Sequence, residues 1–299
     1  MGDTMRVYRS FLFAPGNHPR RVEKVFGCGA DAAILDLEDA VAVAEKPAAR
    51  QAVVQALQRP RECLCYVRVN ATNSEWCYRD LCEVVRPGLD GVLLPKVESA
   101  AGLLAADWLI AQLERERGLA PGGVDLIAIV ETGAGLDRID EIARCGSRVR
   151  RIAFGAADFA LDMNLQWSRE ETEFAYVRAR LVLAARAAGL DPPLDTVWAR
   201  LPDRDGLRDS ARTALAMGFQ GKMCIHPDQI AVVNEVFTPS PEEVARAERI
   251  VEAFRQAEQQ GSASIQLDGQ FIDYPIVQRA RRIVAVVQRI RARERADRA

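Results

Sequence analysis

Short apolar runs recur along the chain about every 30 residues, and most of them end in a charged or polar residue. These runs lie at residues 11–14, 33–38, 65–70, 92–96, 126–131, 152–158, 196–199 and 222–226. The segments between them place apolar residues at three- and four-residue steps, which predicts helices at 40–57, 99–117, 168–188 and 203–217. Strands that alternate with helices predict a parallel sheet, and strands with little alternation are typical of a sheet covered on both faces.

Eight strand–helix units favour an α/β fold of the closed (β/α)8 TIM-barrel type. A doubly wound sheet normally has about five or six strands and often a glycine fingerprint after the first one, which this chain lacks. We expect the barrel to occupy residues 1–238. A Thr-Pro-Ser-Pro break then leads into a helix–hairpin–helix extension, residues 239–299, with the turn at Asp268-Gly269 and the last helix starting at Pro275.

The composition excludes several classes of partner. The chain has 299 residues with 40 basic and 42 acidic side chains, a net charge of −2, which does not favour nucleic acid or an acidic membrane. No apolar run approaches the ~20 residues that span a bilayer, and residues 1–6 show no signal region. Seven scattered cysteines without a C-x-x-C pair indicate reduced thiols, so we expect a cytoplasmic protein.

A parallel barrel brings the C-terminal ends of its strands to one face. The candidate residues expected around that mouth are Asp36, Glu38, Arg68, Lys96, Glu131 and Asp158. Glu131 and Asp158 end neighbouring strands next to small residues that would leave room for a ligand. Two carboxylates without a nearby histidine suit Mg²⁺, although each could instead cap a helix or pair with a base.

Asp36 and Glu38 lie two apart on a strand, so their carboxylates face the same side and require a cation, a base or a proton. Asp39 follows where an acidic residue also suits a helix start. The guanidinium of Arg68 matches a carboxylate in bidentate fashion, which could be that of Glu38 or of a substrate. The surrounding acids should keep the pKa of Lys96 high, so this lysine is expected to be an electrostatic partner rather than a Schiff-base nucleophile.

Basic residues also follow the first strand. His18, Arg20 and Lys24 lie at the start of a predicted helix, where they would form either an anion site or a solvated basic face. His226 ends the eighth strand and could be a base, but a hydrogen-bonded packing role is expected more often.

Eight ordered motifs resemble those of a known family. They are SFLFAPGN at 10–17, LDLEDAV at 35–41, VRVN at 67–70, LPKVE at 94–98, ETG at 131–133, FGAADF at 154–159, GKMCIHP at 221–227 and DGQFIDYP at 268–275. Together they resemble the citrate lyase β-subunit-like branch of the HpcH/HpaI aldolase superfamily, which also includes malyl-CoA, methylmalyl-CoA and citramalyl-CoA lyases.

The resemblance implies a (β/α)8 barrel that forms a homotrimer and uses Mg²⁺. It implies that Glu131 and Asp158 are the metal ligands. It also implies that Arg68 faces the carboxylate or the thioester carbonyl of the substrate.

Further roles follow from the same resemblance. Glu38 and Asp39 occupy the acidic pair of the family, with Asp36 beside them. Asp273 resembles the aspartate that a C-terminal segment delivers as acid/base into the site of a neighbouring subunit. Family members often carry Arg where His18 stands, in a stretch that contacts coenzyme A.

The expected reaction is reversible cleavage of a 3-hydroxy-3-carboxyalkyl thioester, of the citramalyl-, malyl- or citryl-CoA type, to an acyl thioester and a 2-oxo acid. One alternative is the β subunit of a citrate lyase complex, which acts on a thioester of an acyl carrier protein. Others are a pyruvate-dependent class II aldolase and a non-enzymatic CoA-ester-binding protein.

Overall fold

A computed structural model describes residues 7–296 and contains a closed barrel of eight parallel strands. The strands are β1 Ser10–Pro15, β2 Ala32–Asp36, β3 Leu64–Arg68, β4 Gly91–Leu94, β5 Asp125–Val130, β6 Arg151–Phe154, β7 Leu194–Asp195 and β8 Gly221–Cys224. They pair in chain order, and β8 closes the barrel by pairing with β1. The predicted (β/α)8 fold is therefore confirmed.

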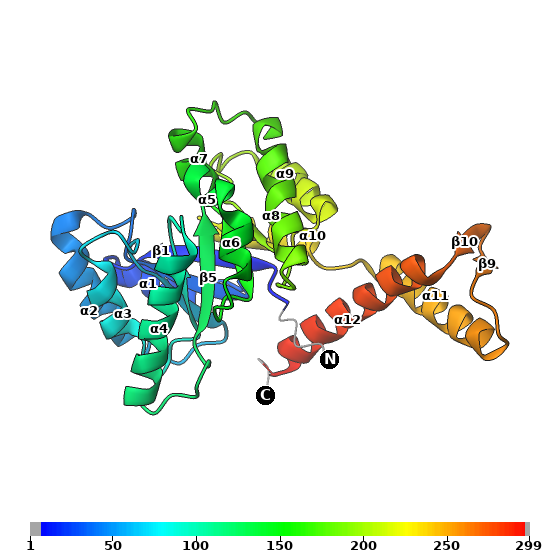
Figure 1. Cartoon of the computed structure of the whole chain (residues 1–299), viewed down its shortest axis with the longest axis horizontal. Coiled ribbons are helices and arrows are strands. Elements are labelled where there is room, and N and C mark those ends of the chain that lie inside the picture. Colours follow the sequence, from blue (N-terminus) through cyan, green and yellow to red (C-terminus); the bar gives the residue numbers. More distant parts are fainter. Residues whose placement is uncertain (1–6, 297–299) are drawn as a thin grey trace. The chain divides into compact units, whose positions relative to one another are not determined.

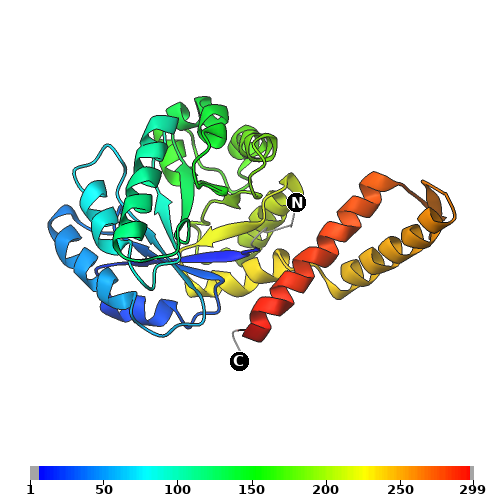
Figure 2. The same cartoon turned by 60° about the horizontal axis from the view of Figure 1, so that its bottom comes forward.

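Helices surround the strands (Figures 1 and 2). Within Tyr8–Phe237 they are α1 Pro19–Val25, α2 Lys46–Ala56, α3 Cys77–Val84, α4 Ala100–Glu116, α5 Gly133–Asp137, α6 Ile139–Arg144, α7 Ala156–Asp162, α8 Ala175–Ala187, α9 Arg204–Met217 and α10 Ile230–Val236. Single 3-10 turns precede three of them, at Val43–Glu45, Thr172–Phe174 and Pro227–Gln229. Ser99 and Asp203 cap α4 and α9, since the side chain of each accepts a backbone N–H of the first turn.

The core has two layers. Inside the barrel, alternate strand residues such as Phe11, Ile34 and Tyr66 fill the interior, and the rings of Phe11 and Tyr66 meet edge to face at 5.3 Å. The larger layer lies between the strands and the helices and is built mainly from valine, leucine and alanine. Because the interior is packed, ligand chemistry is confined to the ends of the barrel.

The seventh strand differs from its prediction at 196–199. β7 is only Leu194–Asp195. Two prolines precede it, and the Thr196 hydroxyl accepts a hydrogen bond from the backbone of Ala156 at 2.9 Å. The prolines have no N–H to donate to a ladder, and Thr196 is engaged by the loop after β6, so pairing stops after two residues.

Two predicted helices start later than expected. The segment from residue 40 becomes α-helical only at Lys46, after the 3-10 turn Val43–Glu45, because the side chain of Asp36 holds the preceding loop through the Ala40 N–H. The helix predicted from Ser168 begins at Ala175. Glu171 adopts a left-handed φ of 54°, which interrupts the helical path, and its carboxylate turns inward to Arg178.

The chain divides into two compact units, one comprising Tyr8–Phe237 and the other containing Thr238–Ala299. The second unit contains α11 Pro241–Gln259, a hairpin of β9 Ile265–Leu267 and β10 Gln270–Ile272, and α12 Tyr274–Ala296. Asp268 and Gly269 form the turn with φ values of 50° and 75°, the conformation that favours an Asp-Gly pair. The predicted helix–hairpin–helix order is therefore present.

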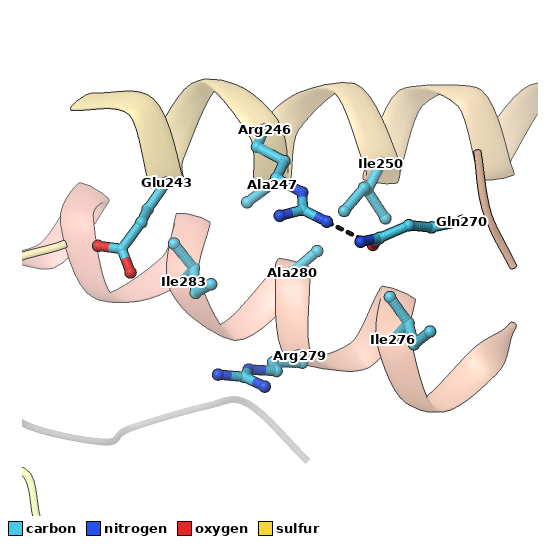
Figure 3. A pocket seen from close by; sticks show the side chains of 9 residues that line it. All are labelled: Glu243, Arg246, Ala247, Ile250, Gln270, Ile276, Arg279, Ala280 and Ile283. Atoms are coloured by element: carbon cyan, nitrogen blue, oxygen red, sulfur yellow. Dashed lines mark hydrogen bonds between the residues drawn. The ribbon is translucent and has the colours of Figure 1, made fainter. Parts of the chain in front are cut away.

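The two long helices of this unit pack through a small apolar cluster of its own. Phe254, Ile272 and Val277 are at its centre. Between α11 and α12 lies a pocket of about 330 Å³ with isoleucine and alanine side chains on its walls and arginine side chains beside them (Figure 3). Arg246 of α11 donates to the side chain of Gln270, which ties the hairpin to the helix.

In the described part of the chain, no helix is both long enough and apolar enough to cross a membrane. All seven cysteines are free thiols. Residues 1–6, in which no signal region is predicted, lie outside the described residues.

Candidate active site at the barrel mouth

Arg68 reaches the mouth as the last residue of β3. It lies opposite Asp36, the last residue of β2. The guanidinium donates to Asp36 through Nε at 2.7 Å and through NH2 at 2.6 Å, while NH1 lies 2.9 Å from Glu38 Oε2. Its face stacks over the ring of Phe13 at 4.9 Å. Burial opposes the charge, but Asp36 and Glu38 raise the pKa of Arg68, so the guanidinium stays protonated.

Asp36 also organises the loop that follows β2. Its carboxylate accepts the backbone N–H of Glu38 at 2.9 Å and that of Ala40 at 3.2 Å. Glu38 lies beyond the end of β2 rather than on the strand, yet its carboxylate still meets Arg68, as the sequence predicts for an acid two residues from Asp36. Burial raises the pKa of Glu38, although Arg68 and Lys96 act in the opposite direction.

Lys96 follows β4 and reaches three carboxylates. Its Nζ lies 2.5 Å from Glu38 Oε1, 3.4 Å from Asp158 Oδ1 and 3.5 Å from Asp39 Oδ1. Burial lowers its pKa, but these acids outweigh burial and raise the pKa above its ordinary value. A lysine that holds its proton so firmly is a poor Schiff-base nucleophile.

Glu131 directly follows β5 and is 2% exposed. Its Oε1 accepts the backbone N–H of Lys96 at 2.8 Å. The space left by the missing side chain of Gly155 is occupied by this carboxylate, because a Cβ at position 155 would overlap it. The small residue predicted to make room for a ligand therefore makes room for Glu131. Burial, together with the charges of Glu38 and Asp158, raises the pKa of Glu131 to about 8.

The prediction that Asp158 ends a strand is wrong, because β6 stops at Phe154. Asp158 lies in the first turn of α7, from which its side chain, 26% exposed, reaches Lys96. Neither carboxylate is a helix cap. Thr132 caps α5 instead of Glu131, and Gly155 is the N-cap position of α7. The structure thus brings both carboxylates to the same mouth, Glu131 from the end of β5 and Asp158 from the first turn of α7.

Buried polar residues behind the mouth hold the loop that carries Glu38 and Asp39. Lys46 is buried, and its Nζ donates to the carbonyl oxygens of Leu37 and Glu38 at 2.8 and 2.9 Å and to Asn70 Oδ1 at 2.7 Å. Asn70 is held in turn by Asp80. Sequence reasoning missed this lysine, and the only signal was the polar Asn70 that ends the VRVN motif.

The remaining candidate residues of the barrel unit follow β1 and β8. His18, Arg20 and Lys24 are exposed on and beside α1, and His18 makes no side-chain cap for that helix. His226 accepts the backbone N–H of Asp228 and so caps a 3-10 turn. Its side chain is 47% exposed, so the expected hydrogen bond is present but the expected packing is not.

Asp273 belongs to the second unit, where it stands directly before α12. Its Oδ1 accepts the backbone N–H of Ile276 at 3.4 Å. It therefore serves as a helix-start residue within its own chain.

The donor set of the mouth fits a hard divalent cation. Among the described residues, no three side chains of the His, Cys, Asp and Glu types form a protein-only metal cage. Mg²⁺ seldom needs one, because it usually takes one or two carboxylates and keeps several waters. Burial raises the pKa of Glu131 most, and the charges of Glu38 and Asp158 raise it further; a cation beside Glu131 and Asp158 would offset both effects.

Comparison with known proteins identifies the family. Residues 9–227 match the HpcH/HpaI aldolase/citrate lyase family model. The chain belongs to this family. It is 38% identical to the citrate lyase subunit beta of Escherichia coli (strain K12), over 94% of this chain and 93% of that protein. It is 33% identical to an L-malyl-CoA/beta-methylmalyl-CoA lyase of Cereibacter sphaeroides, over 96% of both chains.

A solved structure agrees with this assignment. CitE from Mycobacterium tuberculosis, in complex with magnesium, acetoacetate and coenzyme A, is 33% identical, has a TM-score of 0.76, and matches 94% of this chain and 98% of its own. The family that the sequence motifs resemble is therefore confirmed. Like its relatives, the chain is a carbon–carbon lyase.

Proposed function

We propose that the chain is a Mg²⁺-dependent lyase that reversibly cleaves a 3-hydroxy-3-carboxyalkyl thioester into an acyl thioester and a 2-oxo acid. The observation that carries this proposal is the meeting of Glu131 and Asp158 with Arg68 at one barrel mouth. Support comes from CitE, whose similar fold was solved with magnesium, acetoacetate and coenzyme A.

Glu131 and Asp158 are the residues that would hold the metal. When bound, Mg²⁺ supplies Lewis-acid stabilisation of the oxygen on which negative charge develops as the carbon–carbon bond breaks. Glu131 must be ionised for this role. Because its pKa is about 8 without a cation, the carboxyl releases a proton when it becomes a ligand near neutral pH.

Arg68 is suited to bind the substrate anion. Its bidentate contact with Asp36 fixes the plane of the guanidinium, and its stacking on Phe13 covers one face. The group has more N–H donors than the three that Asp36 and Glu38 engage, so donors remain for a carboxylate or a thioester carbonyl. An oriented cation of this kind costs no reorganisation during the reaction.

Proton transfer and coenzyme recognition complete the proposal. Glu38 and Asp39 would hold water and relay protons at the mouth. The extension at 239–299 would place Asp273 in the site of a neighbouring subunit of a homotrimer as the acid/base group. His18, Arg20 and Lys24 would contact the phosphates of coenzyme A, since exposed cations favour a polyanionic ligand.

A second candidate is the β subunit of a citrate lyase complex, with an acyl carrier protein as partner. It is supported by identities of 36–38% with citrate lyase β subunits, compared with 33% for malyl-CoA lyases. This candidate shares the metal and Arg68 and differs in the carrier of the thioester.

The direct test is cleavage by the purified full chain after removal of metal with a chelator. We expect 2-oxo acid release from malyl-, citramalyl- or citryl-CoA only after Mg²⁺ is restored, and loss of release in Glu131→Gln but not in Glu141→Gln on the exposed face of α6. Activity only on citryl-acyl carrier protein would favour the second candidate. Full activity on a CoA ester after thorough chelation would overturn the metal-dependent scheme.

A further inference from the structure

Lys96 has an unusual backbone and an unusual set of contacts. It is one of four non-glycine residues in the described chain with a positive φ, here 49°, a conformation that costs about 1 kcal/mol or more for most residues. In this conformation both its backbone N–H and its ammonium face the mouth. The N–H donates to Glu131 Oε1 at 2.8 Å, and Nζ lies 3.4 Å from Asp158 Oδ1.

One residue therefore contacts both carboxylates that we propose as metal ligands, through two chemically different groups. The backbone N–H orients Glu131 and does not depend on the side chain. The ammonium places a full positive charge beside Asp158 and Glu38. The Lys96 side chain is only 30% exposed, so water screens this charge incompletely.

We infer that Lys96 is a positioning residue that sets the affinity of the mouth for its divalent cation, because its ammonium competes with the ion for Asp158. This inference rests on the proposed function. A divalent ion held by Glu131 and Asp158 would share Asp158 with the lysine. Two cations that share one carboxylate repel each other, and the lysine keeps its charge because Glu38 binds it at 2.5 Å.

Removal of the Lys96 ammonium should change the affinity for the divalent ion in an unusual direction. A residue that only supports the fold of a metal site weakens metal binding when it is removed. Removal of the Lys96 ammonium should instead tighten binding, since the backbone bond to Glu131 remains and the competing charge is gone. Methionine is a suitable replacement because it is unbranched and keeps the length of the apolar stem.

The experiment is a direct titration of Mg²⁺ into the chelator-treated full chain by calorimetry, repeated with Mn²⁺ by electron paramagnetic resonance. We expect Lys96→Met to bind the ion at least about tenfold more tightly than the wild type. Lys96→Arg keeps the charge and should bind like the wild type. Arg208→Met is the matched control, because it removes one positive charge from α9, where Arg208 pairs with Glu235.

The outcomes separate this inference from the proposed function. Wild-type binding with equal or weaker binding in Lys96→Met overturns the role of Lys96 and leaves the metal-dependent lyase intact. Tightening of the same size in Arg208→Met also overturns it, because the effect would then reflect net charge alone. A wild type that binds no divalent ion overturns the proposed function itself. Lys96→Gln is a second variant that carries the same prediction where Lys96→Met does not fold.

Discussion

Two clusters of acids and bases lie in the barrel unit, one fully buried and one partly exposed, and they differ in how their charges are balanced. The first, which we call the β7–β8 network, consists of Glu171, Arg178, Asp195, Ser210 and Lys222. The second is the mouth around Arg68 and Lys96. Both contain one arginine and one lysine, and both join residues that are far apart in the sequence.

The β7–β8 network is balanced and closed. Arg178 binds Asp195 in bidentate fashion at 2.9 and 3.0 Å and Glu171 at 2.6 Å, while Lys222 binds Asp195 at 2.6 Å. The Ser210 hydroxyl donates to Glu171. The charged side chains are 0–2% exposed. Burial alone would raise the pKa of Asp195, but the two cations lower it, so every charge has a partner.

The mouth has an excess of acid. Five carboxylates share two cations, and the acids are Asp36, Glu38, Asp39, Glu131 and Asp158. Burial raises the pKa of both Glu131 and Asp195, but at the mouth the charges of Glu38 and Asp158 add to burial and the pKa of Glu131 rises to about 8, whereas in the β7–β8 network Lys222 and Arg178 outweigh burial and lower the pKa of Asp195. A buried network that is neutral supports the fold, whereas one that lacks positive charge is prepared for a cation. The balance of charge, rather than its amount, distinguishes the two regions.

The largest expected effect is that of Glu131→Gln on catalysis. Loss of a metal ligand should lower kcat/KM by at least about 10³-fold, because the ion supplies several kcal/mol of transition-state stabilisation. The melting temperature in chelator should not fall, since glutamine resembles the protonated carboxyl that the folded site favours. Wild-type kcat/KM in this variant, measured beside Glu141→Gln, would refute the role of Glu131.

Asp195→Asn should show the reverse of Glu131→Gln, a large loss of stability with a small change in activity. Removing one partner of a buried network leaves charges unpaired, and we expect a loss of about 3–5 kcal/mol in the free energy of unfolding, measured with urea. Activity per folded molecule should change far less than in Glu131→Gln. The double variant Asp195→Asn/Lys222→Met, which also removes one of the stranded cations, should recover part of the stability. A stable Asp195→Asn protein with little activity would contradict our view that the β7–β8 network supports the fold and does not take part in catalysis.

Arg68→Lys tests the oriented donors of the mouth. Lysine keeps the charge but cannot reproduce the bidentate bond to Asp36, so we expect kcat/KM to fall about 10²-fold, as when one oriented donor is lost from a site. The affinity for Mg²⁺ should remain close to that of the wild type, because Arg68 is not a ligand. An unchanged kcat/KM would show that Arg68 does not orient the substrate.

The smallest effect concerns pH. The pKa of Glu131 is raised from 4.5 to about 8, so the folded protein holds a proton that the unfolded chain loses between these values. Stability in chelator should therefore be present at low pH and decrease as pH rises towards 8, by roughly 1–2 kcal/mol once the neighbouring acids share the proton. Thermal melts at pH 6 and 9 measure this. Mg²⁺ should remove the decrease and Glu131→Gln should not show it, so an equal decrease in that variant would exclude Glu131 as the cause.

Much of the fold could be predicted from the sequence because most strands are short, apolar and regularly spaced. The exceptions have local causes. β7 is truncated where Thr196 binds the loop after β6. α8 starts late because Glu171 leaves the helical path to join Arg178, a contact that local propensity does not reveal.

Several residues of the candidate site could also be predicted from the sequence, but not all of them. The end-of-strand rule placed Asp36 and Arg68 at one mouth, but the bidentate partner of Arg68 is Asp36 rather than Glu38, the protein carboxylate that the sequence suggested. It failed for Asp158, which reaches the mouth from the first turn of α7. It did not reveal Lys46, because two of the three acceptors of its ammonium are backbone carbonyl oxygens that any sequence would supply, and only the third, Asn70 Oδ1, is a side chain. The roles of Asp273 and of the basic residues near α1 stay predictions.

The central claim is that Glu131 and Asp158 hold one divalent cation at the mouth. The most direct test is calorimetric titration of Mg²⁺ into the chelator-treated full chain and into Glu131→Gln and Asp158→Asn, with thioester cleavage followed in the same samples. We predict one ion per wild-type chain, none in either variant, and cleavage that rises and falls with occupancy. Stoichiometric binding in both variants, or wild-type cleavage without bound ion, would contradict the account.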